Sequence, residues 1–60
     1  MKHKIGDVVE FKTRTGNNTI VGIIRENTGN TYTIGLNYIT VHNIKEEQII
    51  KNRGQFKKDI

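Results

Sequence analysis

The sequence predicts an all-β fold, in which five short strands close into a small, strongly bent barrel. β-Branched residues occupy 21 of the 60 positions (ten Ile, seven Thr and four Val), whereas Ala is absent and Leu occurs once. Such side chains suit a pleated sheet better than a helix. Six Gly and seven Asn recur at short intervals and supply turn residues. Five strands are too few for a sandwich of normal size, but they can form a barrel.

The first expected strand covers residues 5–12, and Gly6-Asp7 near its start suits a turn that launches it. Val9 and Phe11 share one face, because successive side chains of a strand alternate between its two faces. We expect Asp7 to bond to backbone N–H groups of the turn. Glu10 then points to the opposite face, so these two carboxylates do not form a convergent acid/base pair.

A polar loop over residues 13–18 separates that strand from a second one over residues 19–26. The second strand carries apolar side chains on both of its faces. This pattern indicates a strand that is covered on two sides or strongly bent. Gly22 at its centre favours bending, or the close approach of another backbone.

A tight-turn sequence over residues 27–30 predicts a hairpin that leads into a third strand, residues 31–36. Tyr32 shares a face with two aliphatic residues of that strand, so it is predicted to lie in the core rather than to face a ligand. Residues 38–42 form the fourth expected strand, after a turn at Asn37. The predicted core consists of Ile5, Val9, Phe11, Ile24, Ile34, Leu36, Val41 and Ile49.

One short helical or 3-10 turn is predicted before the last strand. Asn43 followed three residues later by Glu46 has the spacing of a capping box. The β-branched pair at residues 49–50 favours the start of a fifth strand. We therefore divide the chain into a barrel, residues 1–52, and a basic, partly ordered C-terminal tail, residues 53–60.

Composition excludes several classes of function. The chain contains neither Cys nor Ser, so it lacks disulfides, thiolate metal sites and the usual nucleophiles of covalent catalysis. His3 lies near a chain end that is expected to fray, and His42 is expected to be a half-exposed strand residue. Two such histidines do not make a metal site. A chain of this length also has little core with which to enclose a substrate. We expect a protein that is not an enzyme and needs no cofactor.

Purely apolar runs are no longer than two residues, which predicts neither a transmembrane helix nor a signal peptide. With no secretion signal and no Cys, the expected location is the cytoplasm, without membrane contact. We expect the chain to be a monomer.

Several segments resemble KOW-type, SH3-like barrels. Residues 6–12 (GDVVEFK) are similar to the first strand of such a barrel, and residues 22–27 followed by 32–34 are similar to its glycine-containing hairpin. Within that group the chain resembles the YkvS-like family of small uncharacterised Firmicute proteins, over residues 4–58 and including the basic, aromatic-containing end. The resemblance implies a bacterial protein with a five-stranded SH3-like barrel. By analogy with KOW-type barrels of ribosomal and transcription-elongation proteins, it also implies contact with RNA or with proteins.

Charge and aromatic residues predict where a partner would bind. The formal net charge is +4, and residues 1–14 and 51–60 are both basic. Chain ends commonly lie close together in an SH3-like barrel, so the two groups are expected to merge into one surface that attracts phosphates. Exposed aromatic side chains beside it could stack bases, although Phe56 could instead cap the barrel. The predicted phosphate contacts are Lys12, Arg14, Arg25, Lys51, Arg53, Lys57 and Lys58, and the predicted stacking residues are Tyr38 and Phe56.

These observations predict a small binding module with weak, salt-sensitive affinity for RNA or an RNA–protein assembly. The alternative is a protein-interaction module that uses an edge or a groove of the barrel and binds no nucleic acid. Salt separates the two hypotheses, because phosphate contacts weaken steeply with ionic strength and apolar groove contacts do so less.

Overall fold

The computed structural model describes residues 2–13, 16 and 18–56, and every structural statement below refers to them. This part of the chain is all-β, with five antiparallel strands in one curved sheet and one 3-10 turn before the last strand, which confirms the expected fold class. The elements are β1 (Asp7–Lys12), β2 (Thr19–Asn27), β3 (Thr31–Gly35), β4 (Thr40–Lys45), η1 (Glu46–Gln48) and β5 (Ile49–Gln55).

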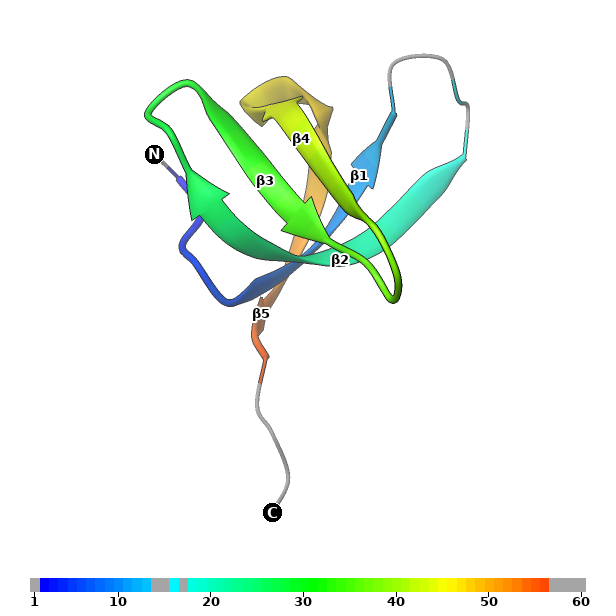
Figure 1. Cartoon of the computed structure of the whole chain (residues 1–60), viewed down its shortest axis with the longest axis horizontal. Helices are drawn as coiled ribbons and strands as arrows, with labels where there is room; N and C mark the ends of the chain where they lie inside the picture. Colours follow the sequence, from blue (N-terminus) through cyan, green and yellow to red (C-terminus); the bar gives the residue numbers. More distant parts are fainter. Residues whose placement is uncertain (1, 14–15, 17, 57–60) are drawn as a thin grey trace.

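The strands lie in the order β4-β3-β2-β1-β5, which is the order of an SH3-like barrel. β1 to β4 pair with their neighbours in sequence, and β5 returns to pair with β1. Figure 1 shows β2 as a long, curved strand that joins the two halves of the sheet. At its centre, a Cβ on Gly22 would lie 2.5 Å from Ile34 Cγ2 and 2.9 Å from the Gly35 carbonyl oxygen. Glycine therefore permits the close approach of β3 that the sequence indicated.

The core lies on the concave side of this curved sheet. β1 contributes Val9 and Phe11, and the facing positions of β2, β3 and β4 complete the interior. These alternating positions confirm most of the predicted core. Leu36, Val41 and Ile49 are partly buried and pack against its margin. The fully or nearly fully buried apolar side chains are Val9, Phe11, Ile24, Tyr32, Ile34 and Ile44.

The prediction that Ile5 lies in the core is wrong, since its side chain is 60% exposed. The chain reverses before β1, where the Asp7 N–H donates a hydrogen bond to the Lys4 carbonyl oxygen at 3.0 Å. Gly6 has a φ of +96° in this turn, a conformation that suits glycine. Strand alternation consequently starts at Asp7, and Ile5 projects away from the sheet.

The predicted start of the fourth strand at residue 38 is also wrong. Tyr38 and Ile39 belong to the turn between β3 and β4, which is closed by a 2.9 Å hydrogen bond from the Leu36 N–H to the Ile39 carbonyl oxygen. β4 runs from Thr40 to Lys45 instead. Both turn residues are exposed.

Asn43 does not begin a helical turn, contrary to the predicted capping box. It lies within β4 with a φ of +60°, at an irregularity in the pairing of β4 with β3. The 3-10 turn begins three residues later, at Glu46. There the Gln48 side chain accepts a 3.0 Å hydrogen bond from the Lys45 N–H and donates one of 2.8 Å to the Lys12 carbonyl oxygen. The expected side-chain bond across the turn therefore exists, but at Lys45 and Gln48.

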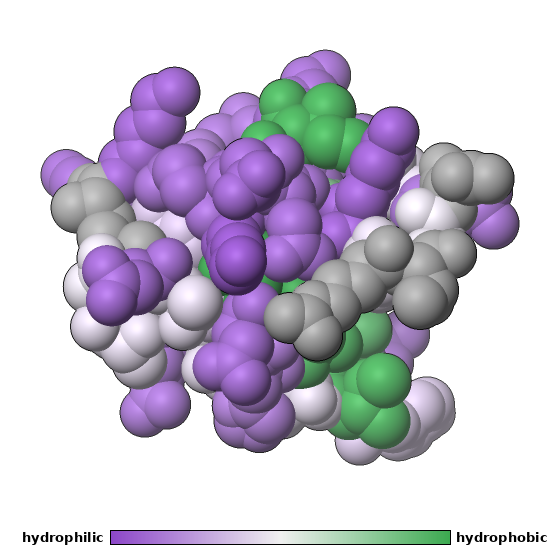
Figure 2. Space-filling view, turned by 90° about the horizontal axis from the view of Figure 1, so that it is seen from above, coloured by the Kyte–Doolittle hydropathy of each residue, from purple (hydrophilic) through white to green (hydrophobic). Residues whose placement is uncertain are grey.

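β5 continues to Gln55, so the predicted boundary after residue 52 falls inside a strand. The pairing with the N-terminal segment extends one residue further, because the Phe56 N–H donates a 2.9 Å hydrogen bond to the Gly6 carbonyl oxygen. No helix in the described part of the chain is long and apolar enough to cross a membrane. Figure 2 shows one face of the molecule, on which hydrophilic side chains surround separate apolar patches.

Candidate functional site

Strand register determines which side chains share the outer face of β2, β1 and β5. Residues that lie directly opposite one another in paired strands project to the same face. This face is opposite to the one that carries Val9 and Phe11, because side chains alternate along β1. Its two central rows are Ile23–Val8–Gly54 and Val21–Glu10–Lys51.

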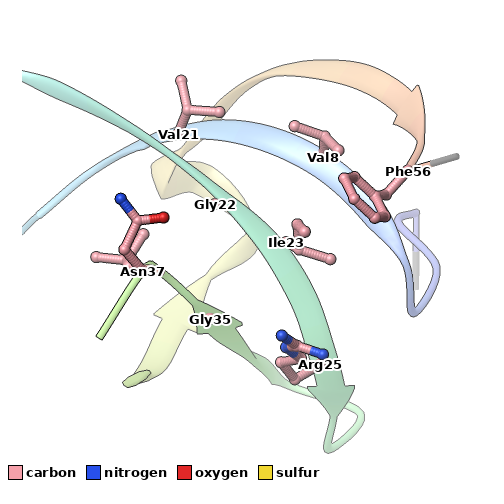
Figure 3. Close-up of a pocket in the computed structure, with 9 residues that line it drawn as sticks. Val8, Val21, Gly22, Ile23, Arg25, Gly35, Asn37 and Phe56 are labelled. Atoms are coloured by element: carbon pink, nitrogen blue, oxygen red, sulfur yellow. The ribbon is translucent and has the colours of Figure 1, made fainter. Parts of the chain in front are cut away.

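A shallow apolar groove, the outer groove, crosses β2 on this face (Figure 3). One half has a volume of about 240 Å³ and the other about 400 Å³. Val21, Leu36 and Asn37 line both halves, so the two are continuous. The first half is completed by Val8, Gly22, Ile23, Arg25, Gly35 and Phe56, and the second by Ile20, Tyr38 and Ile39.

Two of the predicted site residues, Arg25 and Phe56, line the first half of the outer groove. The Arg25 side chain lies against Gly35, where a Cβ would be 2.7 Å from Arg25 Nε. Phe56 follows β5 and is 54% exposed, so it is an exposed residue of the groove rather than a cap on the core. Figure 3 shows these two side chains on either side of Ile23.

Tyr38 lines the second half of the outer groove and is 97% exposed. An aromatic ring with this exposure does not contribute to the core. The turn between β3 and β4 presents it together with Ile39, which is 62% exposed. The structure therefore brings both predicted stacking residues and one predicted phosphate contact, Arg25, to a single groove.

Of the other predicted phosphate contacts, Lys12, Lys51 and Arg53 lie among the described residues, and none of them lines the outer groove. Lys51 is opposite Glu10 in register, and Lys12 is exposed at the end of β1. Arg53 is engaged in an ion pair, with its Nε 2.9 Å from Glu10 Oε2. The pairing of β1 with β5 brings the two basic segments together, as expected. Arg14, Lys57 and Lys58 lie outside the described residues.

Sequence reasoning missed the apolar members of the outer groove and Asn37. One signal was present, because Val21 and Ile23 place apolar side chains on the second face of β2. That pattern is typical of a strand that is buried on both faces. Here the second face of β2 is not buried but lines the outer groove. Asn37 carried no signal beyond its turn propensity.

A polar cluster holds the N-terminal segment on the opposite side of β1. Asp7 is only 7% exposed, and its Oδ2 accepts hydrogen bonds from the Lys4 N–H at 3.0 Å and from Asn52 Nδ2 at 2.8 Å. Gln55 Nε2 donates to Oδ1 at 2.5 Å. The Lys4 N–H first, and then the two amides, hold the pKa of Asp7 below its ordinary value of 3.8. The expectation that Asp7 bonds to local backbone is confirmed.

His3 joins the same cluster, although the sequence placed it near a fraying end. Its Nε2 lies 3.0 Å from Glu46 Oε2, and its backbone N–H donates to the Tyr32 hydroxyl at 3.1 Å. That hydroxyl donates to Glu46 Oε1 at 2.7 Å, which lowers the pKa of Glu46. Burial foremost, and then this bond, raises the pKa of Tyr32. Asn52 Nδ2 also lies 2.8 Å from His3 Nδ1.

We interpret this cluster as structural, because its polar groups bond to one another. No buried side-chain nitrogen or oxygen of the described residues lacks a hydrogen-bond partner. Nor do three His, Cys, Asp or Glu side chains of that part of the chain gather closely enough to hold a metal ion. The bonds attach the N-terminal segment to β3, η1 and β5.

Both edges of the described sheet carry irregularities. In β4, Asn43 has a positive φ where the register with β3 shifts. In β5, the register with β1 shifts twice, and Gly54 has a φ of +97°. Bulges bend an edge strand and oppose the addition of another strand. The outer groove is therefore a better candidate for binding than either edge.

The fold and the groove define a class, a small SH3-like barrel with an exposed apolar and aromatic groove beside basic residues. No family model, no curated protein and no solved structure matches the chain. The outer groove and the charges around it therefore carry the functional interpretation.

Proposed function

We propose that this protein is a non-enzymatic module that binds RNA, or an RNA–protein assembly, weakly and in a salt-sensitive manner. The observation that carries the proposal is the outer groove, which combines the exposed rings of Tyr38 and Phe56 with the guanidinium of Arg25. Aromatic rings beside cations are the usual way in which proteins bind unstacked bases and the phosphates that connect them. The proposal includes membership of the YkvS-like, KOW-type family and a monomer in the bacterial cytoplasm.

The distribution of charge supports the proposal. Three carboxylates are engaged within the molecule: Asp7 accepts hydrogen bonds, Glu10 pairs with Arg53, and Glu46 pairs with His3. These contacts limit their influence on an approaching phosphate. Lys12 and Lys51 are exposed on β1 and β5, on the same side of the sheet as the groove. A positive field with little sequence discrimination follows from this arrangement.

The expected affinity is low. Stacking of one base on an aromatic side chain contributes about 1–3 kcal/mol, so two rings supply roughly 2–6 kcal/mol. A dissociation constant of about 1 mM corresponds to roughly 4 kcal/mol. With a small number of cations around an open groove, we expect affinities in the micromolar to millimolar range at low salt.

The test is an amide NMR titration of the labelled protein with a mixed pool of short single-stranded RNAs, at low and then moderate salt. The expected result is a set of shifts at residues 36–39, at Arg25 and at residues 51–56 that diminishes as salt is added. Phe56→Ala should weaken the shifts. Ile50→Ala is the matched control, because Ile50 is 52% exposed and does not line the outer groove. A dispersed spectrum without shifts would rule out the proposal.

The second candidate is a protein-interaction module that uses the same groove. The observation in its favour is the apolar lining, in which Val8, Val21, Ile23 and Leu36 take part. A bound peptide would make few phosphate-like contacts, so its affinity would change little with salt. Recovery of a partner that survives moderate salt, together with no response to RNA, would favour this candidate.

A further inference from the structure

The lining of the outer groove suits bases that are not paired. A duplex presents phosphates and sugars to its surroundings and keeps its base faces stacked inside. Apolar side chains such as Val21 and Leu36 gain nothing from contact with phosphate, which remains hydrated and charged. They can be covered by the face of an unstacked base, as can the rings of Tyr38 and Phe56.

Asn37 is the one polar side chain that lines both halves of the groove described above. Its amide combines two N–H donors with a carbonyl acceptor. The edge of each nucleobase also places donors and acceptors side by side, so one amide can form two hydrogen bonds with one base. Arg25, by contrast, offers donors alone and suits phosphate or carbonyl oxygens.

Asn37 also occupies a defined position. The turn that contains it is closed by the 2.9 Å hydrogen bond between the Leu36 N–H and the Ile39 carbonyl oxygen. On either side of the turn, Gly35 and Thr40 pair with each other. Figure 3 shows the Asn37 side chain beside Gly22, across β2 from Phe56. A side chain that reads a base must be held in this way by its backbone.

We propose that the outer groove binds an unpaired nucleotide of single-stranded RNA, and that Asn37 determines which base is preferred. This inference rests on the proposed function and adds to it a ligand class and a specificity-determining residue. The base face covers the apolar lining beside Val21, its edge bonds to the Asn37 amide, and Arg25 contacts a flanking phosphate.

The decisive variant is Asn37→Asp, because a carboxylate accepts hydrogen bonds and donates none. Guanine has two neighbouring donors, N1–H and the N2 amino group, that a carboxylate can accept together. Adenine, cytosine and uracil each place an acceptor beside the donor, and a carboxylate repels it. Asn37→Asp should therefore weaken binding overall but move the preference toward guanine by about fivefold or more, the scale of one bidentate contact.

Binding is measured by fluorescence anisotropy at low salt, with short labelled uridine oligonucleotides that carry no substitution or one central A, C or G. Asn30→Asp is the matched control, since it adds the same charge in the turn between β2 and β3, at the other end of β3. We expect it to weaken all four probes by the same factor. Asn37→Ala should reduce the spread among the probes to less than about twofold, as the loss of a bidentate contact requires. A duplex of the same sequence should bind more weakly than the single strand.

An unchanged ranking of the four probes in both Asn37 variants overturns this inference and leaves the proposed function in place. So does a duplex that binds as tightly as the single strand. If the parent protein binds none of the probes, the proposed function and this inference fail together. Asn37→Gln, which retains the amide, should keep the parental ranking and shows that the Asp effect does not come from damage to the turn.

Discussion

Replacing Asp7 by Asn should remove much of the stability that the N-terminal cluster provides, and only at pH values where the carboxylate is ionised. In the parent, one carboxylate oxygen accepts two hydrogen bonds, from Lys4 and Asn52, and the other accepts one from Gln55. The Asn side chain has one acceptor, the amide oxygen, and one donor group, the amide NH2. Whichever way the amide turns, a donor faces a donor on one side unless a neighbouring amide also turns.

The size of the loss follows from the nature of these bonds. A hydrogen bond to a charged group contributes about 1.5–3 kcal/mol, against about 1 kcal/mol for a neutral pair. Asp7 is itself buried, but its three partners are exposed residues that solvent screens, so the lower end of this difference applies, about 0.5 kcal/mol per bond. If Gln55 turns to accept from the new amide, all three contacts survive in neutral form, and the net loss is about 1.5 kcal/mol. For a domain of this size that loss lowers Tm by roughly 6–12 °C.

The pH dependence identifies the carboxylate as the cause. The folded state lowers the pKa of Asp7 below its ordinary value of 3.8, so folding favours the ionised form. The resulting stability is fully present above that ordinary value and is lost as pH falls through the lowered pKa of the folded state. A protonated Asp7 resembles Asn, and the parent should therefore approach the variant in acid.

The assay is thermal unfolding, monitored by circular dichroism at neutral pH and at about pH 2.5. At the lower pH, most of the stability that ionised carboxylates contribute is lost. Glu26→Gln is the control for the loss of a carboxylate, because Glu26 is exposed. The Tm of Asp7→Asn should also fall in acid, since the pKa of Glu46 is lowered in the folded state as well. If the parent and Asp7→Asn differ in Tm by the same amount at both pH values, the charge on Asp7 is not what these bonds require.

Three further predictions concern other parts of the molecule. Gly22→Ala should lower Tm by up to roughly 20 °C, because overpacking against Ile34 costs about 1–3 kcal/mol and the stiffer unfolded chain returns about 0.4–1 kcal/mol. Tyr32→Phe should cost about 1.5–3 kcal/mol, because the lost hydrogen bond goes to the ionised Glu46 carboxylate, and unfolding in urea at neutral pH measures it. Glu10→Gln should release Arg53 from its ion pair and raise the affinity for single-stranded RNA by about threefold at low salt. Moderate salt should remove this gain. An affinity that does not change would place Arg53 outside the interface.

Local patterns were sufficient where the physical cause was local. The alternation of Val9 and Phe11 assigned the inner face of β1, and Gly22 marked the place where two backbones approach closely. Turn chemistry assigned Asp7 to a hydrogen bond with backbone N–H groups. In each case the residues responsible are neighbours in sequence or follow the period of a strand.

Features that depend on distant partners could not be predicted from those patterns. The cluster around His3 joins residues that are 29 and 49 positions apart, and no spacing in the sequence indicates such a contact. Residues 38–42 alternate as a strand does. The hydrogen bond to the Ile39 carbonyl oxygen nevertheless places residues 38 and 39 in a turn, so β4 starts at Thr40. Asn43 has a positive φ and lies at an irregularity within β4, and the 3-10 turn begins only at Glu46.

The candidate site depends on the same distinction. Tyr38, Arg25 and Phe56 were selected by residue type, and the fold brings them to one groove because β2 crosses between the β3–β4 turn and the end of β5. Their type was visible in the sequence, but their proximity was not. Asn37 is a candidate because it lines both halves of the groove, a position that no pattern in the sequence indicates.

The arrangement of exposed apolar residues distinguishes a binding surface from ordinary exposure. Exposed apolar side chains are normal in small proteins, and Ile5 and Ile50 are exposed without lining the groove. Val21, Tyr38 and other apolar residues of the outer groove instead line one continuous groove. A chain of 60 residues with 33% hydrophobic residues has little apolar surface to spare from its core. Val21 and Ile23 lie on the outer face of β2 and so add little to the core, and the unpaired base that we propose as ligand would cover them.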